Sequence, residues 1–346
     1  MSELDKPIVV QKMHQFIRKI RRNNNQIGTI SRSITLDYNN ACNFKCEFCY
    51  EEEAKVYSKE SLSFDKIAEL ADEAHEIGIW EVILQGGELL IDLPKLLRII
   101  SAFKPERFRM ILVSNGYLLT PETAKALADA GLDCLGISIS GMDEEEHDRS
   151  RGGVKGAHKR ALRALDYGKE AGLTVWAHSI FGHHNARSKD LFDLLEYLKK
   201  RDYGIYFCLA MPFGVWKDNY LDAEDLRIFQ KIRKEYKASF DTWDFYDSKK
   251  EKITGCWSVN RLFITPLGDV LPCPYMNIKI GNVKEQPLKE IIDYGFGIKY
   301  FGEYSPICLS AQNRQFREKY LDQHMSMFHP AEASEIFGSD DFIIKN

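Results

Sequence analysis

The chain has 346 residues, of which 44% are hydrophobic and 28% are charged, and its formal net charge is −4. This composition excludes a disordered protein, and the length allows one large domain, or one of roughly 200 to 250 residues with a smaller partner. The charge gives no support for nucleic acid or a membrane as partner. No run approaches the roughly 20 apolar residues of a membrane span, and no signal peptide is evident, so we expect a cytoplasmic protein with reduced cysteines.

The first 30 residues contain a basic segment with helical periodicity. Val10, Met13, Ile17 and Ile20 fall on one face of this segment, and several arginines and lysines surround them. An amphipathic pattern of this kind is typical of a helix that packs on a globular body and keeps its cations in water. We therefore predict an N-terminal helix or arm over residues 1–30.

Residues 31–212 alternate between strand-like runs and amphipathic helical runs. The runs rich in β-branched and aromatic residues are 33–37, 81–85, 108–113, 134–139, 173–180 and 205–210. Helical runs such as 63–78 and 120–131 begin at a serine or threonine cap and end at a glycine. This alternation predicts an α/β fold, a partial (β/α)6 TIM-like barrel, with functional groups at the carboxyl ends of its parallel strands.

The pattern changes after residue 212. We predict a linker region at 213–244 that contains one long helix over 223–240. A smaller domain is expected at 245–312, where residues 261–274 predict a β-hairpin. Residues 313–346 form a C-terminal extension whose last part has no regular pattern.

Three cysteines follow the first predicted strand with the spacing C-x3-C-x2-C, at Cys42, Cys46 and Cys49. Such short gaps let one loop direct several thiolates at a single zinc ion or iron-sulfur cluster. Structural zinc prefers four protein ligands, and no fourth cysteine or histidine follows closely. A 4Fe-4S cluster held by three thiolates would instead leave one iron open to a small molecule.

The motif CNFKCEFCY resembles the signature of radical S-adenosylmethionine (SAM) enzymes. Further motifs resemble that family over about residues 30–212: QGGE after the second strand, SNG after the third, ISISG after the fourth, and an arginine in HDRSRGG. The resemblance implies that these motifs contact SAM through Gly86, Gly87, Glu88, Asn115, Ser138 and Arg151.

The same resemblance implies the opening chemistry. SAM would bind the open iron, and an electron from the cluster would split SAM into methionine and a 5'-deoxyadenosyl radical. That radical would take a hydrogen atom from the substrate. An external one-electron reductant such as flavodoxin or ferredoxin would supply the electron.

A second set of cysteines lies in the predicted smaller domain. Cys256 and Cys273 flank Gly268 in the pattern C-x11-G-x4-C, and Cys308 follows. The pattern resembles the opening of the SPASM and twitch extensions, which bind auxiliary clusters in radical SAM enzymes. It implies one auxiliary 4Fe-4S cluster held by these three cysteines. The fourth ligand stays open between Cys208 or Cys134, a non-cysteine side chain, water and the substrate.

The remaining candidates lie on the later strands. Cys134 is expected to be a core residue, whereas Cys208 is near the rim end of the sixth strand and is a candidate hydrogen-atom donor, as in radical SAM epimerases. His178, His183 and His184 are candidates for a substrate-facing base or for ordinary loop residues.

These features predict a radical SAM oxidoreductase or epimerase. The resemblance favours a small metabolite as substrate, through oxidation or epimerisation of a sugar-like or aminocyclitol-like alcohol. A peptide-modifying enzyme, an epimerase or a crosslinking maturase, is the alternative. A non-catalytic iron-sulfur electron carrier is the alternative from another class, although the GGE motif and an open three-cysteine site argue against it.

Overall fold

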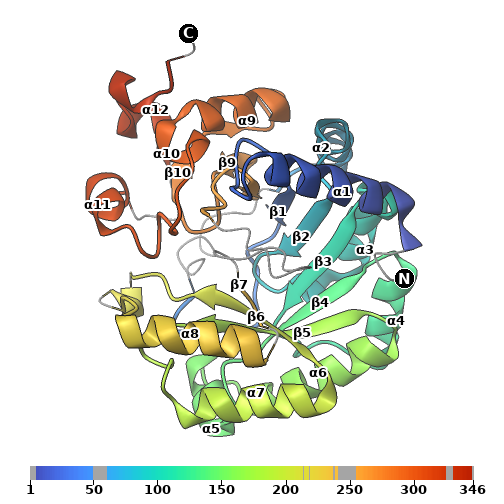
Figure 1. Cartoon of the computed structure of the whole chain (residues 1–346). Helices are drawn as coiled ribbons and strands as arrows, with labels where there is room; N and C mark the ends of the chain where they lie inside the picture. The colour runs from blue at the N-terminus through green and yellow to red at the C-terminus, as the bar shows by residue number, and fades with distance from the viewer. Residues whose placement is uncertain are drawn as a thin grey trace.

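One twisted sheet forms the centre of the molecule. The structure is a computed structural model, and within the residues that it describes ten strands form this sheet in the order β11-β9-β8-β1-β2-β3-β4-β5-β6-β7 (Figure 1). The described residues are 5–49, 61–212, 214–217, 219–236, 238–240, 255–324 and 330–344. In these residues no helix has both the length and the apolar character that crossing a bilayer requires.

The predicted strands of the barrel are present, each within one residue of the expected bounds. They are β1 (Ser33–Asp37), β2 (Glu81–Gln85), β3 (Arg109–Ser114), β4 (Cys134–Ser138), β5 (Thr174–Phe181) and β6 (Gly204–Leu209). All neighbours from β1 to β6 pair in parallel. The predicted α/β fold with a partial barrel is therefore confirmed.

Helices cover the outer face of these strands (Figure 1). They are α2 (Phe64–Ile77), α3 (Leu93–Ala102), α4 (Pro121–Asp129), α5 (Glu144–Ser150), α6 (Ala157–Glu170) and α7 (Lys189–Arg201). The caps follow the sequence prediction, because Ser63 accepts a hydrogen bond from the Lys66 amide and Gly78 ends the helix in the left-handed region. Outward strand residues such as Leu84 and Leu112 pack with the helices in one core.

The expected N-terminal helix is α1 (Pro7–Arg22), which packs on the body. Its buried face includes Phe16 and Ile20, which form a small cluster with Trp80 and Trp257. Just before the helix, the buried Lys6 ammonium pairs with the carboxylate of Asp133. This ion pair and the apolar contacts fix the helix to the barrel.

The helix predicted over 223–240 is shorter than expected. Helix α8 (Ala223–Glu235) ends at Glu235, and β7 (Ser239–Phe240) pairs in parallel with β6. Pairing with the open edge of β6 satisfies backbone groups that a longer helix would leave without partners. Residues 241–254, which include the first ten residues of the predicted smaller domain, lie outside the described residues.

The predicted C-terminal hairpin extends the barrel sheet instead of forming a separate sheet. Strand β8 (Arg261–Ile264) pairs in parallel with β1, and β9 (Asp269–Leu271) returns antiparallel to β8 and β11 (Gly281–Asn282). The turn requires Gly268, whose φ is 91°.

The other C-terminal elements gather beyond β1, where α9 (Leu288–Gly297) contacts α2 (Figure 1). They are α10 (Lys299–Gly302), α11 (Arg314–Phe316), α12 (Ala333–Ile336) and the paired short strands β10 (Ile278–Lys279) and β12 (Ala331–Glu332). Of these, β12 and α12 give regular structure to part of the extension in which the sequence showed no pattern.

Candidate functional site

A cavity of about 710 Å³ lies inside the partial barrel. Ten of the predicted site residues line it: Cys42, Cys46, Cys49, Gly86, Gly87, Asn115, Ser138, Arg151, His178 and Cys208. Arg261, Pro274 and Tyr275 complete its lining from the C-terminal hairpin region. The structure therefore brings the first cysteine set, the glycine motif and the candidate hydrogen donor to one cavity.

The cysteine loop and the GGE motif are joined through their backbones. The amide of Gly87 donates to the carbonyl of Asn39 at 2.8 Å, and the amide of Glu88 donates to the carbonyl of Ala41 at 2.7 Å. A Cβ atom added at Gly87 would lie 2.1 Å from the Ala41 carbonyl oxygen. Glycine is therefore required here, because only a bare backbone lets the two loops approach so closely.

The Glu88 carboxylate is turned into the protein. It is fully buried, and it accepts hydrogen bonds from the Ser114 hydroxyl at 2.9 Å and the Asn115 amide at 2.8 Å. The amide of Leu90 donates to it as well, at 3.1 Å. Burial raises the pKa of this carboxyl. Its side chain thus holds the end of β3 in place, while Gly86 and Gly87 line the cavity; a contact of Glu88 with SAM stays a prediction.

The surroundings of the first cysteine set suit an anionic cluster. The amide of Phe44 points at Cys42 Sγ at 3.4 Å, and Arg151 Nη1 lies 3.9 Å from Cys46 Sγ. Arg151 also covers the ring of Phe48 at 4.9 Å, and its buried Nε has no hydrogen-bond partner among the described residues. Donors directed at sulfur favour thiolates, and the guanidinium of Arg151, which lines the cavity, suits an anionic ligand such as a carboxylate.

Aromatic rings stack on the cysteine loop. The rings of Phe48 and Trp216 are stacked, with their centres 5.3 Å apart. The ring of His184 is also stacked with that of Trp216, again with the centres 5.3 Å apart. Asn219 bonds the His184 ring at 2.6 Å. His184 is thus part of the rim structure, and the cavity lining includes Phe48 and Trp216 instead.

One wall of the cavity carries a histidine and a cysteine in contact. His178 Nε2 lies 3.0 Å from Cys208 Sγ, and the Tyr275 hydroxyl also bonds the thiol. Burial, together with Arg261 and Arg151, lowers the pKa of His178 to about 4. Burial raises the pKa of Cys208. At neutral pH the pair is therefore a neutral imidazole and a thiol that keeps its hydrogen.

The cavity floor contains charged residues that sequence reasoning missed. Glu81 pairs with Arg32 at 3.0 Å and with Arg109 at 2.9 Å, and Arg261 Nη1 donates to the Tyr206 hydroxyl at 2.7 Å. Glu81, Arg109 and Arg261 are the first residues of β2, β3 and β8. A charged residue at the start of a strand is usually interpreted as solvent-exposed, so the signal in the sequence was weak.

The second cysteine set lies in the C-terminal region and is not among the residues that line the cavity. Cys273 and Cys308 are buried and Cys256 is half-buried. Burial and the Cys256 thiol raise the pKa of Cys273 to about 12, and burial, Cys256 and Cys273 raise that of Cys308. The Ala311 amide donates to Cys308 Sγ at 3.3 Å. The three thiols interact electrostatically, and the positive charge of a metal centre would offset the cost of thiolate formation here.

The two cysteines considered as a fourth ligand have other neighbours. Cys134 packs in the barrel wall with Ile83 and Ile111, which agrees with its predicted core role. Cys208 pairs with His178 in the cavity. The fourth ligand of the second set stays open.

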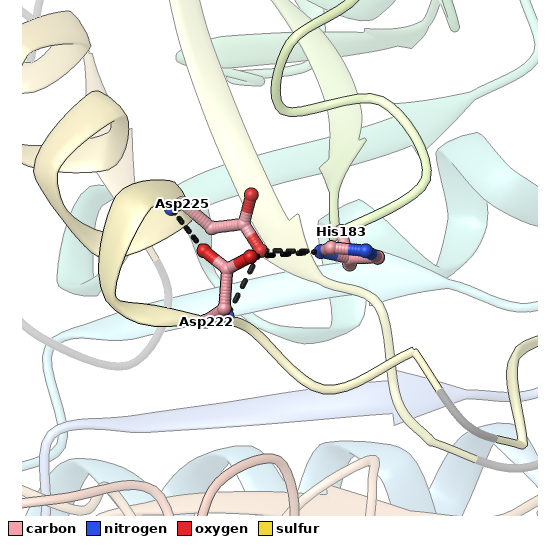
Figure 2. Close-up of side chains that lie close together, drawn as sticks. All are labelled: His183, Asp222 and Asp225. Carbon is pink, nitrogen blue, oxygen red and sulfur yellow. Dashed lines mark hydrogen bonds and ion pairs between the residues drawn. The ribbon is translucent and has the colours of Figure 1, made fainter.

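His183 belongs to a surface clasp between β5 and α8 (Figure 2). His183 Nδ1 lies 2.7 Å from Asp225 Oδ2, and Asp222 caps the helix by accepting the amides of Glu224 and Asp225. Arg187 pairs with Asp222 at 2.6 Å and with Asp225 at 3.1 Å. Because a guanidinium already balances these carboxylates, the group is a helix cap and loop anchor, and of the three candidate histidines only His178 lines the cavity.

Comparisons with known proteins agree with this geometry. The sequence matches the family described as the radical SAM superfamily over residues 37–211, and an iron-sulfur cluster-binding domain, SPASM, over residues 256–320. An AdoMet-dependent heme synthase of Methanosarcina barkeri is 28% identical over 286 residues, covering 75% of this chain and 81% of the relative. The PqqA peptide cyclase of Rhizobium meliloti is 26% identical over 270 residues, covering 72% and 70%.

A solved structure shares the fold. Native anSMEcpe with bound AdoMet superposes with a TM-score of 0.60 at 16% identity, covering 83% of this chain and 96% of that one. The two domain matches imply SAM, a 4Fe-4S cluster and auxiliary iron-sulfur as cofactors, and the two cysteine sets provide the thiol ligands that such clusters need. The chain therefore belongs to the radical SAM superfamily, as an enzyme with a C-terminal SPASM iron-sulfur domain.

Proposed function

We propose that this enzyme acts on a small molecule held in the barrel cavity and that Cys208 returns a hydrogen atom to it, which is the chemistry of an epimerisation. The observation that carries the proposal is the Cys208–His178 pair inside the cavity whose rim is formed by the first cysteine set. A cavity of about 710 Å³ is within the usual range of small-molecule sites.

The rim would hold the cofactors. Cys42, Cys46 and Cys49 are the proposed ligands of the SAM-binding cluster, and the backbone of Gly86 and Gly87 would line the SAM site with Asn115, Ser138 and Arg151. The guanidinium of Arg151 lines the cavity, which suits the carboxylate of SAM. When bound, SAM and the cluster supply the 5'-deoxyadenosyl radical that removes one hydrogen atom from the substrate.

The Cys208 wall would complete the reaction. The substrate carbon radical takes the hydrogen atom of the Cys208 S–H bond, so a new C–H bond forms and a sulfur-centred radical remains. One electron from an external reductant such as flavodoxin or ferredoxin, and one proton, restore the thiol. Because neutral His178 holds the thiol in the cavity and burial keeps it protonated, the donor is positioned and loaded at neutral pH.

The second cysteine set has a proposed role of its own. Cys256, Cys273 and Cys308 are the proposed ligands of one auxiliary 4Fe-4S cluster. None of the three is among the residues that line the cavity, which fits electron transfer better than direct substrate binding.

The experiment has two stages. SAM cleavage to 5'-deoxyadenosine is first measured with reduced enzyme and cell-extract fractions, and we expect stimulation by molecules below about 1 kDa. The reaction is then run in deuterium oxide, where the Cys208 thiol carries deuterium. The product should gain one deuterium at carbon with the wild type and with Cys134→Ser, whose cysteine lies in the barrel wall, but not with Cys208→Ser. An unlabelled, oxidised wild-type product would contradict the proposal and favour alcohol oxidation.

A peptide substrate is the second candidate. It is supported by the likeness to a PqqA peptide cyclase over most of both chains. In the first stage, this candidate predicts that a peptide fraction stimulates SAM cleavage while the small-molecule fraction does not. Epimerisation of a peptide α-carbon would still use Cys208, so the deuterium result tests the donor in both cases.

A further inference from the structure

We propose that Tyr275 is a further catalytic residue, which returns a hydrogen atom from its hydroxyl group to the sulfur of Cys208 after Cys208 has donated to the substrate. The inference rests on the proposed function, to which it adds the step that restores the thiol. Tyr275 lines the cavity, and it contacts both the proposed hydrogen donor and a cysteine of the second set. These two contacts join the regions that the proposed reaction uses.

The backbone of Tyr275 contacts the second cysteine set. Its amide donates a hydrogen bond to the thiol of Cys273. The amide of Met276 donates to the carbonyl of Cys273 at 3.3 Å, which closes a β-turn over residues 273–276. Pro274 occupies the second position of this turn, where its restricted φ is favoured. The sequence Cys-Pro-Tyr therefore folds so that the tyrosine backbone faces the preceding thiol.

The side chain of Tyr275 contacts the hydrogen donor. Its hydroxyl bonds the thiol of Cys208, and His178 Nε2 lies 3.0 Å from the same sulfur. A tyrosine hydroxyl can donate to sulfur while the free nitrogen of a neutral imidazole accepts. The O–H of Tyr275 can therefore point at the sulfur while the S–H of Cys208 points at His178 or at the substrate. A second hydrogen atom is thus in place beside the sulfur before the thiol reacts.

This hydrogen atom can repair the sulfur radical. When the substrate carbon radical has taken the hydrogen of the Cys208 S–H bond, an unpaired electron remains on sulfur. The O–H bond of Tyr275 then breaks and a new S–H bond forms, which leaves a neutral radical on the tyrosine oxygen. One electron from the external reductant of the flavodoxin or ferredoxin class, and one proton, restore the O–H bond. Thiol S–H and phenol O–H bonds have similar strengths, so the transfer needs little driving force.

The transfer moves the unpaired electron from the substrate side towards the second cysteine set. Tyr275 stands two positions after Cys273, a proposed ligand of the auxiliary cluster, and its own amide contacts that thiol. An electron delivered at the second set would need to reach only Tyr275 to complete the reaction. The second set can therefore serve the reaction although its cysteines are not among the residues that line the cavity.

Another tyrosine in the cavity provides a matched control. Tyr206 lies two residues before Cys208 on β6 and also lines the cavity. Its hydroxyl accepts a hydrogen bond from Arg261 Nη1 at 2.7 Å, whereas the hydroxyl of Tyr275 bonds the thiol. Tyr206→Phe and Tyr275→Phe therefore remove the same group from the same cavity, and both keep the ring that packs there.

The test detects a radical on Tyr275. Cluster-loaded enzyme is reduced, freed of excess reductant, mixed with SAM alone and frozen. Its electron paramagnetic resonance signal is measured per molecule of 5'-deoxyadenosine formed. Without substrate, the 5'-deoxyadenosyl radical should take its hydrogen atom from Cys208, which lines the same cavity. We expect a tyrosyl radical whose signal narrows when the tyrosine rings carry deuterium. Cleavage of SAM without a tyrosyl radical in the wild type would overturn the proposal.

Variants assign the signal. It should be lost in Tyr275→Phe and in Cys208→Ser, and it should be retained in Tyr206→Phe. A signal that persists in Tyr275→Phe, or that disappears only in Tyr206→Phe, would contradict the assignment.

A second measurement counts turnovers with the small-molecule fraction that stimulates SAM cleavage. Tyr275→Phe should form its first product molecule as fast as the wild type, because the Cys208 S–H bond is intact. Later turnovers should slow by about tenfold or more, because the sulfur radical is restored slowly. A merely structural role of Tyr275 would slow the first turnover as much as the later ones, and that result would contradict the proposal.

These results separate the inference from the proposed function. A tyrosyl radical on Tyr275 without a deuterated product would leave the exchange between Tyr275 and Cys208 standing and remove the transfer from Cys208 to the substrate. A deuterated product that depends on Cys208, with no tyrosyl radical and with normal later turnovers in Tyr275→Phe, would do the reverse.

Discussion

The two cysteine sets differ in their surroundings. Cys42, Cys46 and Cys49 are half-buried on a loop that lines the cavity, whereas Cys273 and Cys308 are buried in the C-terminal region. The first set is surrounded by donors and aromatic rings that leave room for a ligand, and the second by other thiols and backbone amides. This difference is the basis of our proposal that the first set holds the cluster nearest the substrate and the second set transfers electrons.

The largest expected effect separates the two sets by activity. Cys46→Ala should lower SAM cleavage by at least about a thousandfold, since the radical chemistry belongs to the cofactor and not to the protein. Cys256→Ala should keep SAM cleavage within about tenfold while the substrate reaction falls. The measurement is 5'-deoxyadenosine formation after chemical reduction. Equal loss in both variants would show that the sets do not act separately.

A glycine substitution should damage the rim alone. Gly87→Ala places a methyl group on the Ala41 carbonyl, so we expect a loss of about 3 kcal/mol or more in unfolding free energy, or a displaced cysteine loop with weakened SAM binding. Thermal unfolding and SAM titration check both results. Gly338→Ala is the matched control, because a Cβ there meets nothing within 4 Å. Unchanged stability and SAM binding in Gly87→Ala would contradict the claim that the close contact between the cysteine loop and the GGE motif requires glycine.

Gly268→Ala is the corresponding glycine substitution in the C-terminal region, which holds the second cysteine set. Gly268 has a left-handed φ of 91°, and a Cβ would lie 2.9 Å from Asn282 Oδ1. We expect a loss of about 1 to 2 kcal/mol in stability and less auxiliary iron, with SAM cleavage retained. Iron content and 5'-deoxyadenosine formation are measured together. Loss of SAM cleavage with a normal iron content would contradict the proposal that the two cysteine sets have separate roles.

The smallest expected effect is a pH dependence at the cavity wall. The pKa of His178 is lowered to about 4, below its usual value, so the unfolded chain binds a proton that the folded chain does not take up. Stability is therefore present above about pH 6.5 and is lost as the pH falls towards 4. Between pH 7 and pH 5.5 the loss should be about 1 kcal/mol for this residue.

His178→Gln checks this contribution. Denaturant unfolding of both proteins at the two pH values should show a smaller pH dependence in the variant. His147, whose pKa is lowered to about 3, is unchanged and contributes equally to both. Identical pH dependence would mean that His178 is not held neutral by burial.

The sequence was informative where local signals and structure agree. The strands at 33–37 and 81–85 and the caps at Ser63 and Thr120 follow from residue type and spacing. The pairing of β8 with β1 has no local signal, because it joins residues more than two hundred positions apart. Helix α8 was predicted too long because the polar residues after Glu235 also suit a helix. In the structure, residues 239 and 240 pair with the edge of β6 instead.

Site residues followed the same rule. Motif residues such as Cys42 and Gly87 could be proposed from the sequence because they stand in short local motifs, and both line the cavity. The floor was missed because Glu81 and Arg109 stand far apart in sequence and face inward only once the barrel closes. The hydrogen bond from Ser114 to Glu88 was not foreseen either, because it depends on a tertiary contact; the contact of Glu88 with SAM stays a prediction.

The most direct test of the account is the iron content and Mössbauer spectrum of the anaerobically reconstituted protein, compared with a variant in which Cys42, Cys46 and Cys49 are alanine. The account predicts about eight irons per chain falling to about four, with the spectrum of one cluster in the wild type changing when SAM is added. About four irons falling to none would contradict it, because the second cysteine set would then hold no cluster of its own.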